Sequence, residues 1–361
     1  MKQGWTYKKL NEVCDKGSSN IVINKLEDNN GDYPLFGASG LVKNVDFYHQ
    51  DKPYIGIVKD GAGVGRVNTY PAFSSLVGTM QYIFAKEECL LDYLKYFLVK
   101  LDLSHCVSGA TIPHIYFKDY GKEKIPVPSI DIQQDIVSEL NKINELIALK
   151  KSQLNDFDYL IQSIFYEMFG DPVVNDKKWE VKKLGDVCKF TQGMQVPIEE
   201  QQLSKGNGLV QFLRIIDFTQ GKDAPRYVKC TSDKYLLHER EIAIVRYGTP
   251  GFVCYGKIGA IANNLFKITP NQKDLFEFEF LVHWLNTDAF QSAVKNKQYG
   301  AALQAIKFST IQGIDIIIPS LTVQQSFATR ISQIEKQKQY IEESIKDLES
   351  LLASRMQYWF D

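Results

Sequence analysis

Two cations, Lys59 and Arg246, stand in settings that suit contact with a phosphate or with the edge of a guanine. Each follows a short apolar run typical of a strand, Tyr54-Ile-Gly-Ile-Val58 in one case and Glu241-Ile-Ala-Ile-Val245 in the other, and a glycine comes two residues later. A glycine at a strand end lets the main chain approach a phosphate closely, and the cation beside it can bind phosphate or guanine. The alternative interpretation is that both are solvated turn residues.

Two loops of small residues supply further candidate contacts to nucleic acid. They are Ser108-Gly-Ala-Thr111 and Tyr299-Gly-Ala-Ala302, and we expect the Thr111 hydroxyl and the Tyr299 ring to reach backbone or bases. His114 could read a guanine or could have a structural role. Arg214 could contact nucleic acid or could pair with Asp217, three residues further on. The remaining candidates are Arg66, Tyr247, Thr249 and Lys257.

The sequence patterns nearest to those of an enzyme do not fit a catalytic site. Gly61-Ala-Gly-Val-Gly65 has nucleotide-loop spacing, but such a loop should open a helix, and the residues after it are typical of extended chain. An Asn-Pro-Pro-aromatic methyltransferase motif is not found, and Asp176, Glu180 and Lys182 are too tightly spaced for a nuclease site. The six cysteines form no CxxC pair, which argues against zinc and predicts reduced, mostly buried thiols. We therefore expect no catalysis, metal or cofactor in this chain.

Composition narrows the class of protein further. The net charge of −1 argues against a protein that coats nucleic acid without specificity, because such proteins are strongly basic. No apolar run reaches the length of about 18 residues that a membrane span requires. The start of the sequence lacks the apolar stretch of a secretory signal. We expect a cytoplasmic protein.

The candidate contacts must be positioned by a scaffold, and the chain contains two copies of one. Ile125-Pro-Val-Pro-Ser-Ile-Asp-Ile-Gln-Gln134 recurs as Ile316-Ile-Ile-Pro-Ser-Leu-Thr-Val-Gln-Gln325, at an offset of 191 residues. Trp5-Thr-Tyr-Lys-Lys-Leu10 recurs as Trp179-Glu-Val-Lys-Lys-Leu184, at an offset of 174. The ends of the unit match while the interiors differ, which indicates a shared scaffold around a variable working part.

Each copy ends in a sequence that predicts a long helix, over residues 131–169 and 322–360. Asp131-x-x-Gln134 and Thr322-x-x-Gln325 have the form of capping boxes, and no proline interrupts either segment. Apolar residues follow the alternating four-three step of a coiled-coil seam. The seam residues are Ile136, Leu140, Ile143, Ile147, Leu154, Phe157, Ile161 and Ile164 in the first helix, and Phe327, Ile331, Ile334, Ile341, Ile345, Leu348 and Leu352 in the second.

The two stripes predict a coiled coil within the chain. If they bury each other, the second helix must run back toward the first domain, so the coil is antiparallel and the domains lie at opposite ends about a pseudo-two-fold axis. The alternative is that each helix packs only on its own domain. The expected fold class is α+β, with two mixed α/β domains separated by two long antiparallel helices. The expected boundaries are 1–124 and 173–315 for the domains, and 125–172 and 316–361 for the strand-and-helix segments.

Over its whole length the chain resembles the DNA-specificity subunit of type I restriction–modification systems. The most specific features are the twice-used Ile-Pro element followed by Gln-Gln and a long helix, and the twice-used Trp-x-x-x-Lys-Leu opening. Tyr33-Pro-Leu-Phe-Gly-Ala-Ser-Gly40 is similar to one subtype of the family's target recognition domains, and Phe212-Leu-Arg-Ile-Ile-Asp217 is similar to another. Two subtypes imply two different half-site sequences.

The resemblance implies a non-catalytic subunit that reads an asymmetric, bipartite site on double-stranded DNA with a fixed gap. It implies as partners two adenine-methyltransferase subunits, which bind S-adenosylmethionine, and motor-nuclease subunits, which use ATP and Mg. A membrane partner is not expected. The alternative hypothesis is a coiled-coil adaptor that binds proteins and reads no DNA sequence.

Overall fold

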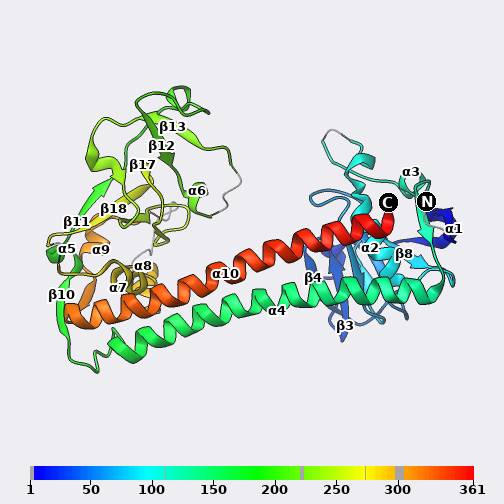
Figure 1. Ribbon diagram of the computed structural model, residues 1–361, viewed down its shortest axis with the longest axis horizontal. Coiled ribbons are helices and arrows are strands. Elements are labelled where there is room, and N and C mark those ends of the chain that lie inside the picture. The colour runs from blue at the N-terminus through cyan, green and yellow to red at the C-terminus, as the bar shows by residue number, and fades with distance from the viewer. Residues whose placement is uncertain (1–3, 110, 220–222, 273, 297–304) are drawn as a thin grey trace. The chain divides into compact units, whose positions relative to one another are not determined.

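The computed structural model describes residues 4–109, 111–219, 223–272, 274–296 and 305–361 (Figure 1). The chain divides into two compact units. Unit 1 comprises Met1–Ser152 and Ile341–Asp361, and unit 2 comprises Gln153–Tyr340. Each unit therefore contains one copy of the sequence repeat together with a segment of both long helices.

Unit 1 contains three small sheets and a set of short helices. The strand orders are β1-β9, β2-β8-β5-β6 and β4-β3-β7. The strands are β1 (Thr6–Lys9), β2 (Cys14–Ser18), β3 (Tyr33–Gly37), β4 (Gly40–Val45), β5 (Tyr54–Val58), β6 (Val67–Tyr70), β7 (Ser75–Leu76), β8 (Met80–Ala85) and β9 (Lys124–Val127). The short helices are α1 (Leu10–Val13), η1 (Ile23–Lys25), α2 (Leu91–Leu101), η2 (Leu103–Cys106) and α3 (Phe117–Tyr120).

Unit 2 repeats this plan with different side chains. Its strand orders are β10-β19, β11-β18-β15-β16 and β13-β12-β17-β14. The strands are β10 (Glu180–Lys183), β11 (Cys188–Gln192), β12 (Leu209–Leu213), β13 (Arg226–Lys229), β14 (Leu236–Leu237), β15 (Ile242–Val245), β16 (Val253–Cys254), β17 (Gly259–Ile261), β18 (Leu265–Pro270) and β19 (Asp315–Ile318). The short helices are α5 (Leu184–Val187), η3 (Ile198–Glu200), α6 (Ile215–Thr219), η4 (Asp233–Tyr235), α7 (Phe278–Leu285), α8 (Asp288–Asn296) and α9 (Phe308–Gln312).

The two motifs that recur in the sequence pair with each other inside each unit. The Trp-x-x-x-Lys-Leu opening supplies β1 and β10, and the Ile-Pro element supplies β9 and β19. The pairs are antiparallel, with Thr6 opposite Val127 in unit 1 and Glu180 opposite Ile318 in unit 2. This shared two-stranded frame closes each unit at its base. It explains why the ends of the repeat match while the interiors vary.

The long helices are α4 (Ile130–Phe169) and α10 (Leu321–Phe360), within one residue of the predicted bounds. All fifteen predicted seam residues are buried or half-buried. In unit 1 the two helices run antiparallel, since Glu139 pairs with Arg355 and Lys151 with Glu349. In unit 2 they are also antiparallel, since Asp158 pairs with Lys338 and Glu167 with Arg330.

The capping boxes predicted at the start of these helices are wrong. The helices begin at Ile130 and Leu321, two residues earlier than caps at Asp131 and Thr322 require, so both predicted cap residues lie inside the helices. The first glutamine of each Gln-Gln pair, Gln133 or Gln324, is completely buried and bonds to other segments. The residue types matched a capping box, in which Gln134 and Gln325 would bond to the start of their helices. The glutamine that makes buried hydrogen bonds is instead the preceding one, Gln133 or Gln324.

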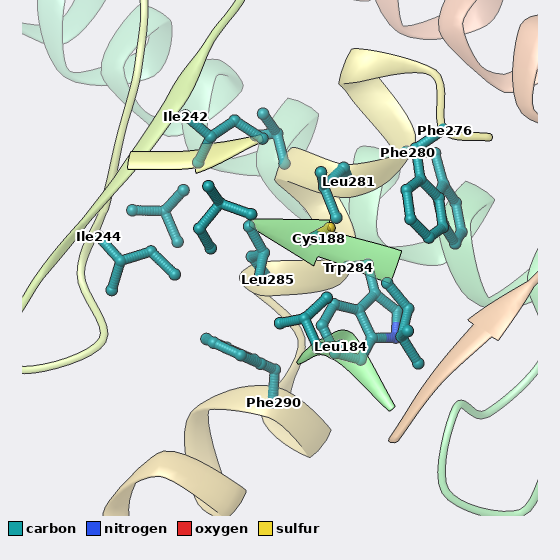
Figure 2. Packing of buried hydrophobic residues seen from close by; sticks show 14 of the residues in the cluster. Leu184, Cys188, Ile242, Ile244, Phe276, Phe280, Leu281, Trp284, Leu285 and Phe290 are labelled. Atoms are coloured by element: carbon teal, nitrogen blue, oxygen red, sulfur yellow. The ribbon is translucent and has the colours of Figure 1, made fainter. Parts of the chain in front are cut away.

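In each unit, the hydrophobic core includes residues of both long helices. In unit 1, Ile136 and Leu140 of α4 join Met356 and Phe360 of α10 in one cluster. In unit 2, the larger cluster combines Ile161, Phe165 and Phe169 of α4 with Phe327, Ile331 and Ile334 of α10. Figure 2 shows part of this cluster, in which the α7 residues Phe280, Leu281, Trp284 and Leu285 share the core with the strand residues Ile242 and Ile244. The alternative that each helix packs only on its own domain is therefore wrong.

The four buried cysteines are structural thiols. Cys14, Cys89, Cys188 and Cys254 are buried and free of disulfides. Burial raises the pKa of each to about 12, so each is a neutral thiol at physiological pH.

His283 makes the stability of unit 2 depend on pH. Desolvation, and then the nearby Lys338, lowers its pKa from 6.5 to about 4. The unfolded chain therefore binds a proton more readily than the folded chain between pH 6.5 and 4, and stability falls as the pH falls through that window. We expect the ring to account for about 2 kcal/mol of lost stability between pH 7.5 and pH 5.

The test compares urea unfolding at these two pH values. His283→Phe should lose this part of the pH dependence, because Tyr96 of unit 1 shows that an aromatic ring fits the corresponding position of α2. The control is His238→Gln, since His238 is exposed. An unchanged pH dependence in His283→Phe would contradict the assignment.

Candidate DNA interface

Lys59 is held at its main chain by two segments of unit 1. Its N–H donates to the carbonyl of Thr79 at 3.0 Å, and its carbonyl accepts from the N–H of Ile115 at 2.9 Å. Asp60 forms a bridge with His114. The Lys59 ammonium lies 3.8 Å from the Asp60 carboxylate and the side chain is half-buried. The backbone is thus fixed where β5 ends, and the cation is presented from a rigid base.

The glycine loop after Lys59 is a connection between strands. Gly61, Gly63 and Gly65 all have positive φ, between 82° and 87°, a conformation that favours glycine. The chain then enters β6, so no helix follows, as the sequence predicted. Arg66 folds back over this loop: a Cβ on Gly63 would lie 2.0 Å from its Nη2, and its Nη1 donates to the carbonyl of Ala38 at 3.2 Å.

The segment with Thr111 and His114 lies against this loop. Gly61 N–H donates to the carbonyl of Pro113 at 2.9 Å, and Ser108 and His114 exchange main-chain hydrogen bonds at 2.9 and 2.8 Å. Thr111 is exposed, and the His114 ring is half-buried. We call residues 59–66 together with 107–109 and 111–115 the unit-1 loop cluster. It brings together Lys59, Arg66, Thr111 and His114.

Arg246 occupies the same place in unit 2 that Lys59 occupies in unit 1. Its N–H donates to the carbonyl of Asn264 at 2.8 Å, and its carbonyl accepts from the N–H of Ile306 at 2.8 Å. Tyr247 forms a bridge with Ala305, as Asp60 does with His114. The guanidinium is half-buried, and within the described part of the chain it has neither an ion pair nor a hydrogen bond. Residues 246–251 with 305–306 are the unit-2 loop cluster.

A polar groove beside the unit-2 loop cluster was missed by sequence analysis. Tyr247, which was predicted, lines it, and its hydroxyl donates to Oδ1 of Asn263 at 3.4 Å. The groove is also lined by Gln195, Gln201, Arg226, Asn263 and Asn264. Amide side chains in this setting can read adenine edges. These residues come from four separate segments, so no spacing in the sequence could have signalled them.

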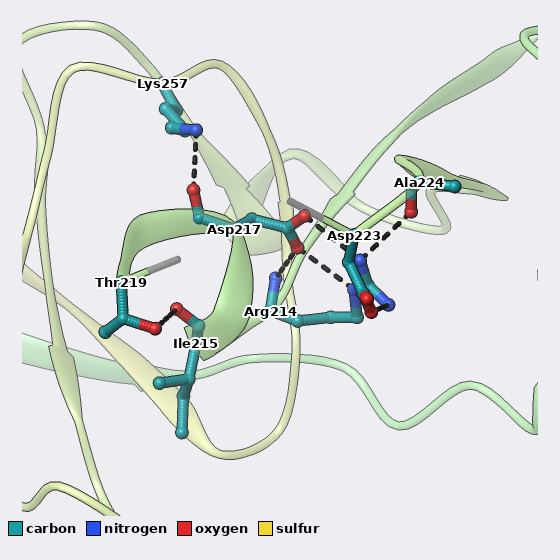
Figure 3. Close-up of polar contacts among 7 residues, drawn as sticks. All are labelled: Arg214, Ile215, Asp217, Thr219, Asp223, Ala224 and Lys257. Carbon is teal, nitrogen blue, oxygen red and sulfur yellow. Dashed lines mark hydrogen bonds and ion pairs between the residues drawn. The ribbon is translucent and has the colours of Figure 1, made fainter. Parts of the chain in front are cut away.

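Arg214 and Lys257 hold a turn of unit 2 together (Figure 3). The Arg214 guanidinium donates to both carboxylate oxygens of Asp217, at 3.0 and 3.1 Å, and to the carbonyl of Ala224 at 3.2 Å. These bonds to Asp217 raise the pKa of Arg214 above its ordinary value. Lys257 donates to the main-chain carbonyl of Asp217 at 2.6 Å. Of the two interpretations of Arg214, the structure contains the internal ion pair.

The turn held by this network is α6, which lies beside the unit-2 loop cluster. A Cβ on Gly248, which has φ of 95°, would lie 3.8 Å from Cδ1 of Ile215. Thr249, another predicted contact, is exposed in the same loop. Tyr299 lies outside the described residues. Arg214 and Lys257 therefore stabilise the turn beside the loop cluster. Within the cluster, Tyr247 and Thr249 are exposed and Arg246 is half-buried.

The fold defines the class of protein as a duplicated α/β scaffold with two long helices. Each copy has the same two-stranded frame, and each carries a different loop cluster. Residues 2–156 and 176–350 match the type I restriction modification DNA specificity domain. The chain therefore belongs to the family of type I restriction–modification specificity subunits. No helix in the described residues has the length and apolarity needed to cross a membrane.

Relatives and solved structures agree with this assignment. The chain is similar to the type I restriction enzyme MjaIX specificity subunit of Methanocaldococcus jannaschii, with 24% identity over 78% of this chain and 68% of that protein. The MjaVIII specificity subunit of the same organism is 23% identical over 77% of this chain and 73% of that protein. The S subunit from M. genitalium has a similar fold, with a TM-score of 0.56, 15% identity and coverage of 100% and 98%. A chain from a structural study of the complex assembly of a type I system also has a similar fold, with a TM-score of 0.58 and 17% identity. The match covers 99% of this chain and 97% of that chain.

Proposed function

We propose that this specificity subunit reads an asymmetric, bipartite DNA site, with one half-site contacted by each loop cluster in the major groove. The observation that carries the proposal is the equivalence of Lys59 and Arg246. Both cations sit at the same main-chain position of the repeated fold, and the residues around them differ. A repeated position with unlike surroundings suits two readers with different base preferences. We call the two units without their long-helix segments and without the frame strands β1, β9, β10 and β19 the recognition domains.

The test maps methylated adenines in cells with and without this chain. A second arm exchanges residues 179–315 for the corresponding segment of another specificity subunit. We expect only one half-site of the methylated sequence to change. A coiled-coil adaptor that binds only proteins predicts no change in sequence preference, so that result would favour the rival hypothesis.

The chemistry is expected on partner subunits. Two adenine-methyltransferase subunits would bind S-adenosylmethionine, and motor-nuclease subunits would use ATP and Mg, while this chain would act in the cytoplasm without catalysis. The net charge of −1 supports a shared interface, because phosphate neutralisation drives most DNA affinity and this chain has little excess positive charge. Weak DNA binding by the chain alone is expected.

The long helices are proposed to set the gap between the half-sites. Removing one heptad from each of α4 and α10, in matching register, shortens each helix by about 10.5 Å, the rise of about three base pairs. We therefore expect a gap shorter by up to about three base pairs, with both half-site sequences unchanged. Sequencing of methylated adenines measures both quantities. If the bases that are read change while the gap stays the same, the helices do not act as a spacer.

A further inference from the structure

One buried glutamine in each unit joins three segments through its side-chain amide. In unit 1, Gln133 of α4 accepts at Oε1 from the N–H of Leu90 at 2.8 Å. Its Nε2 donates to the carbonyls of Glu88 at 2.9 Å and Pro128 at 3.0 Å. Both amide protons and the carbonyl oxygen are thus used, and the side chain is completely buried.

The same arrangement recurs in unit 2. Gln324 of α10 accepts at Oε1 from the N–H of Glu277 at 2.8 Å, and its Nε2 donates to the carbonyls of Leu275 at 3.1 Å and Pro319 at 2.9 Å. It too is completely buried. We call each set of three hydrogen bonds a glutamine clamp.

Each clamp joins parts that have different roles. Leu90 and Glu277 are the residues that precede α2 and α7. These helices share a core cluster with β5 in unit 1 and with β15 in unit 2. Pro128 and Pro319 directly follow the frame strands β9 and β19. The glutamines belong to the long helices. One side chain therefore ties recognition domain, frame and long helix together in each unit.

The receiving groups in the recognition domains are main-chain atoms. Glu88-Cys-Leu90 and Leu275-Phe-Glu277 differ at each of the three positions, yet they make the same bonds. A clamp of this kind holds any domain that offers a helix start in the right place. It is consistent with a constant frame that accepts variable recognition domains.

Hydrogen bonds add to this joint an angular constraint that the apolar core does not supply. Apolar burial is non-directional, whereas hydrogen bonds weaken steeply when their angles change. A gap altered by one base pair moves a half-site by about 3.4 Å and turns it by roughly 35° about the duplex. A recognition domain that is rigidly seated on its helix cannot follow that movement.

We propose that Gln133 and Gln324 are positioning residues that fix the seating of each recognition domain on its long helix, and thereby set how strictly the gap length is read. This inference rests on the proposed function. It adds a named joint to the spacer, and it assigns a role to the Gln-Gln motif that neither DNA contact nor helix capping explains.

The test uses the full-length chain in complex with its methyltransferase subunits. Duplexes carry both mapped half-sites at the native gap or at a gap changed by one base pair. Gln133→Glu and Gln324→Glu keep the side-chain shape but replace two donors with a carboxylate that faces two carbonyls. The matched controls are Gln134→Glu and Gln325→Glu, because these neighbouring glutamines are exposed.

We expect methylation at the altered gaps, relative to the native gap, to rise roughly tenfold in the clamp variants, the scale set by losing one buried hydrogen-bonding group. The controls should match the original chain, and the half-site bases should stay the same. Rates are compared at a temperature at which circular dichroism shows every variant folded. If activity falls equally at all gaps, the clamp only stabilises the fold and the proposal is wrong.

A second pair of variants covers the case in which the glutamate substitutions prevent folding. Glu277→Pro removes the N–H that Gln324 binds, and the φ of −70° at Glu277 already suits proline. Glu277→Ala keeps that N–H and loses the same ion pair with Arg240. The proline variant should relax the gap relative to the alanine variant, and equal stringency would overturn the proposal.

Failure of this inference can be told apart from failure of the proposed function. If the original chain supports methylation at one defined gap and the clamp variants keep that gap strictly, only the role of the clamp is refuted. If the original chain supports no bipartite methylation at all, the proposed function itself fails.

Discussion

Arg246→Ala should reduce methylation of the complete bipartite site by about 5- to 150-fold, which corresponds to about 1–3 kcal/mol for the loss of a base-contacting arginine. The backbone at Arg246 is fixed by hydrogen bonds to Asn264 and Ile306. Only the Arg246 side chain therefore has to be ordered when it contacts DNA. The measurement is the initial rate of adenine methylation by the reconstituted complex on a duplex that carries both half-sites.

Lysine at this position separates two kinds of contact. Arg246→Lys keeps a positive charge for a phosphate but loses the two-pronged donor geometry that matches guanine. If Arg246 reads guanine, the lysine variant should resemble the alanine variant and should tolerate other bases at one position. If it binds phosphate, the lysine variant should retain most activity and its original base preference.

The control for Arg246 removes a cation from the same unit at a different place. Arg330 lies on α10, is about half exposed and is 3.9 Å from Glu167. Arg330→Ala should leave sequence preference unchanged. Lys59→Ala should weaken reading of the other half-site, because Lys59 belongs to the other unit. Full activity of both Lys59→Ala and Arg246→Ala would remove the observation on which the proposed interface depends.

The equivalence of these two cations was only partly predictable from the sequence. Apolar runs ending in a cation and a glycine indicated that both lie at strand ends, and the structure has them there. Their deeper equivalence depends on hydrogen bonds to Ile115 and Ile306. Those partners are more than fifty residues away along the chain, and no local pattern encodes such a bond.

Arg214 and Lys257 illustrate the opposite case. Both were named as candidate DNA contacts, and both make hydrogen bonds inside unit 2. The ion pair of Arg214 with Asp217 spans three residues and was foreseen as an alternative. The bond from Lys257 to the carbonyl of Asp217 spans forty residues, and its acceptor is a main-chain atom. Side-chain types give no signal for such an acceptor.

The long helices were predicted almost completely because their determinants are local and repeated. Eight seam residues in α4 and seven in α10 define one apolar face on each helix, and neither helix contains a proline. The identity of the buried glutamine was not predicted. Gln133 and Gln134 are the same residue type. Which of them is buried depends on how the start of α2, at Leu90, packs against α4.

Phe327→Ala should be the most destabilising of these substitutions, at about 3–5 kcal/mol. Phe327 is completely buried. The centroid of its ring lies 5.8 Å from that of Phe165, 5.2 Å from that of Phe169 and 5.4 Å from that of the His283 ring. It thus links α4, α10 and α7 within unit 2. Urea unfolding of the purified chain, followed by far-ultraviolet circular dichroism, measures the change.

A matched control lies on the same helix. Tyr340 is 65% exposed, so Tyr340→Ala should change stability by no more than about 0.5 kcal/mol. Phe327→Leu should cost less than Phe327→Ala, because leucine fills more of the space that the ring occupies. If Phe327→Ala costs under about 1 kcal/mol, the site collapses around the smaller side chain.

The Phe327 result also bears on how the two reading units depend on each other. Unit 2 is held together by the aromatic cluster around Phe327, whereas unit 1 has its own cluster around Ile136 and Phe360. Unfolding of Phe327→Ala should therefore begin in unit 2. Because α4 and α10 each supply residues to both cores, loss of helix pairing in unit 2 should propagate along them into unit 1. A single cooperative transition shifted to lower urea would show that propagation, and two separate transitions would show that the units unfold independently.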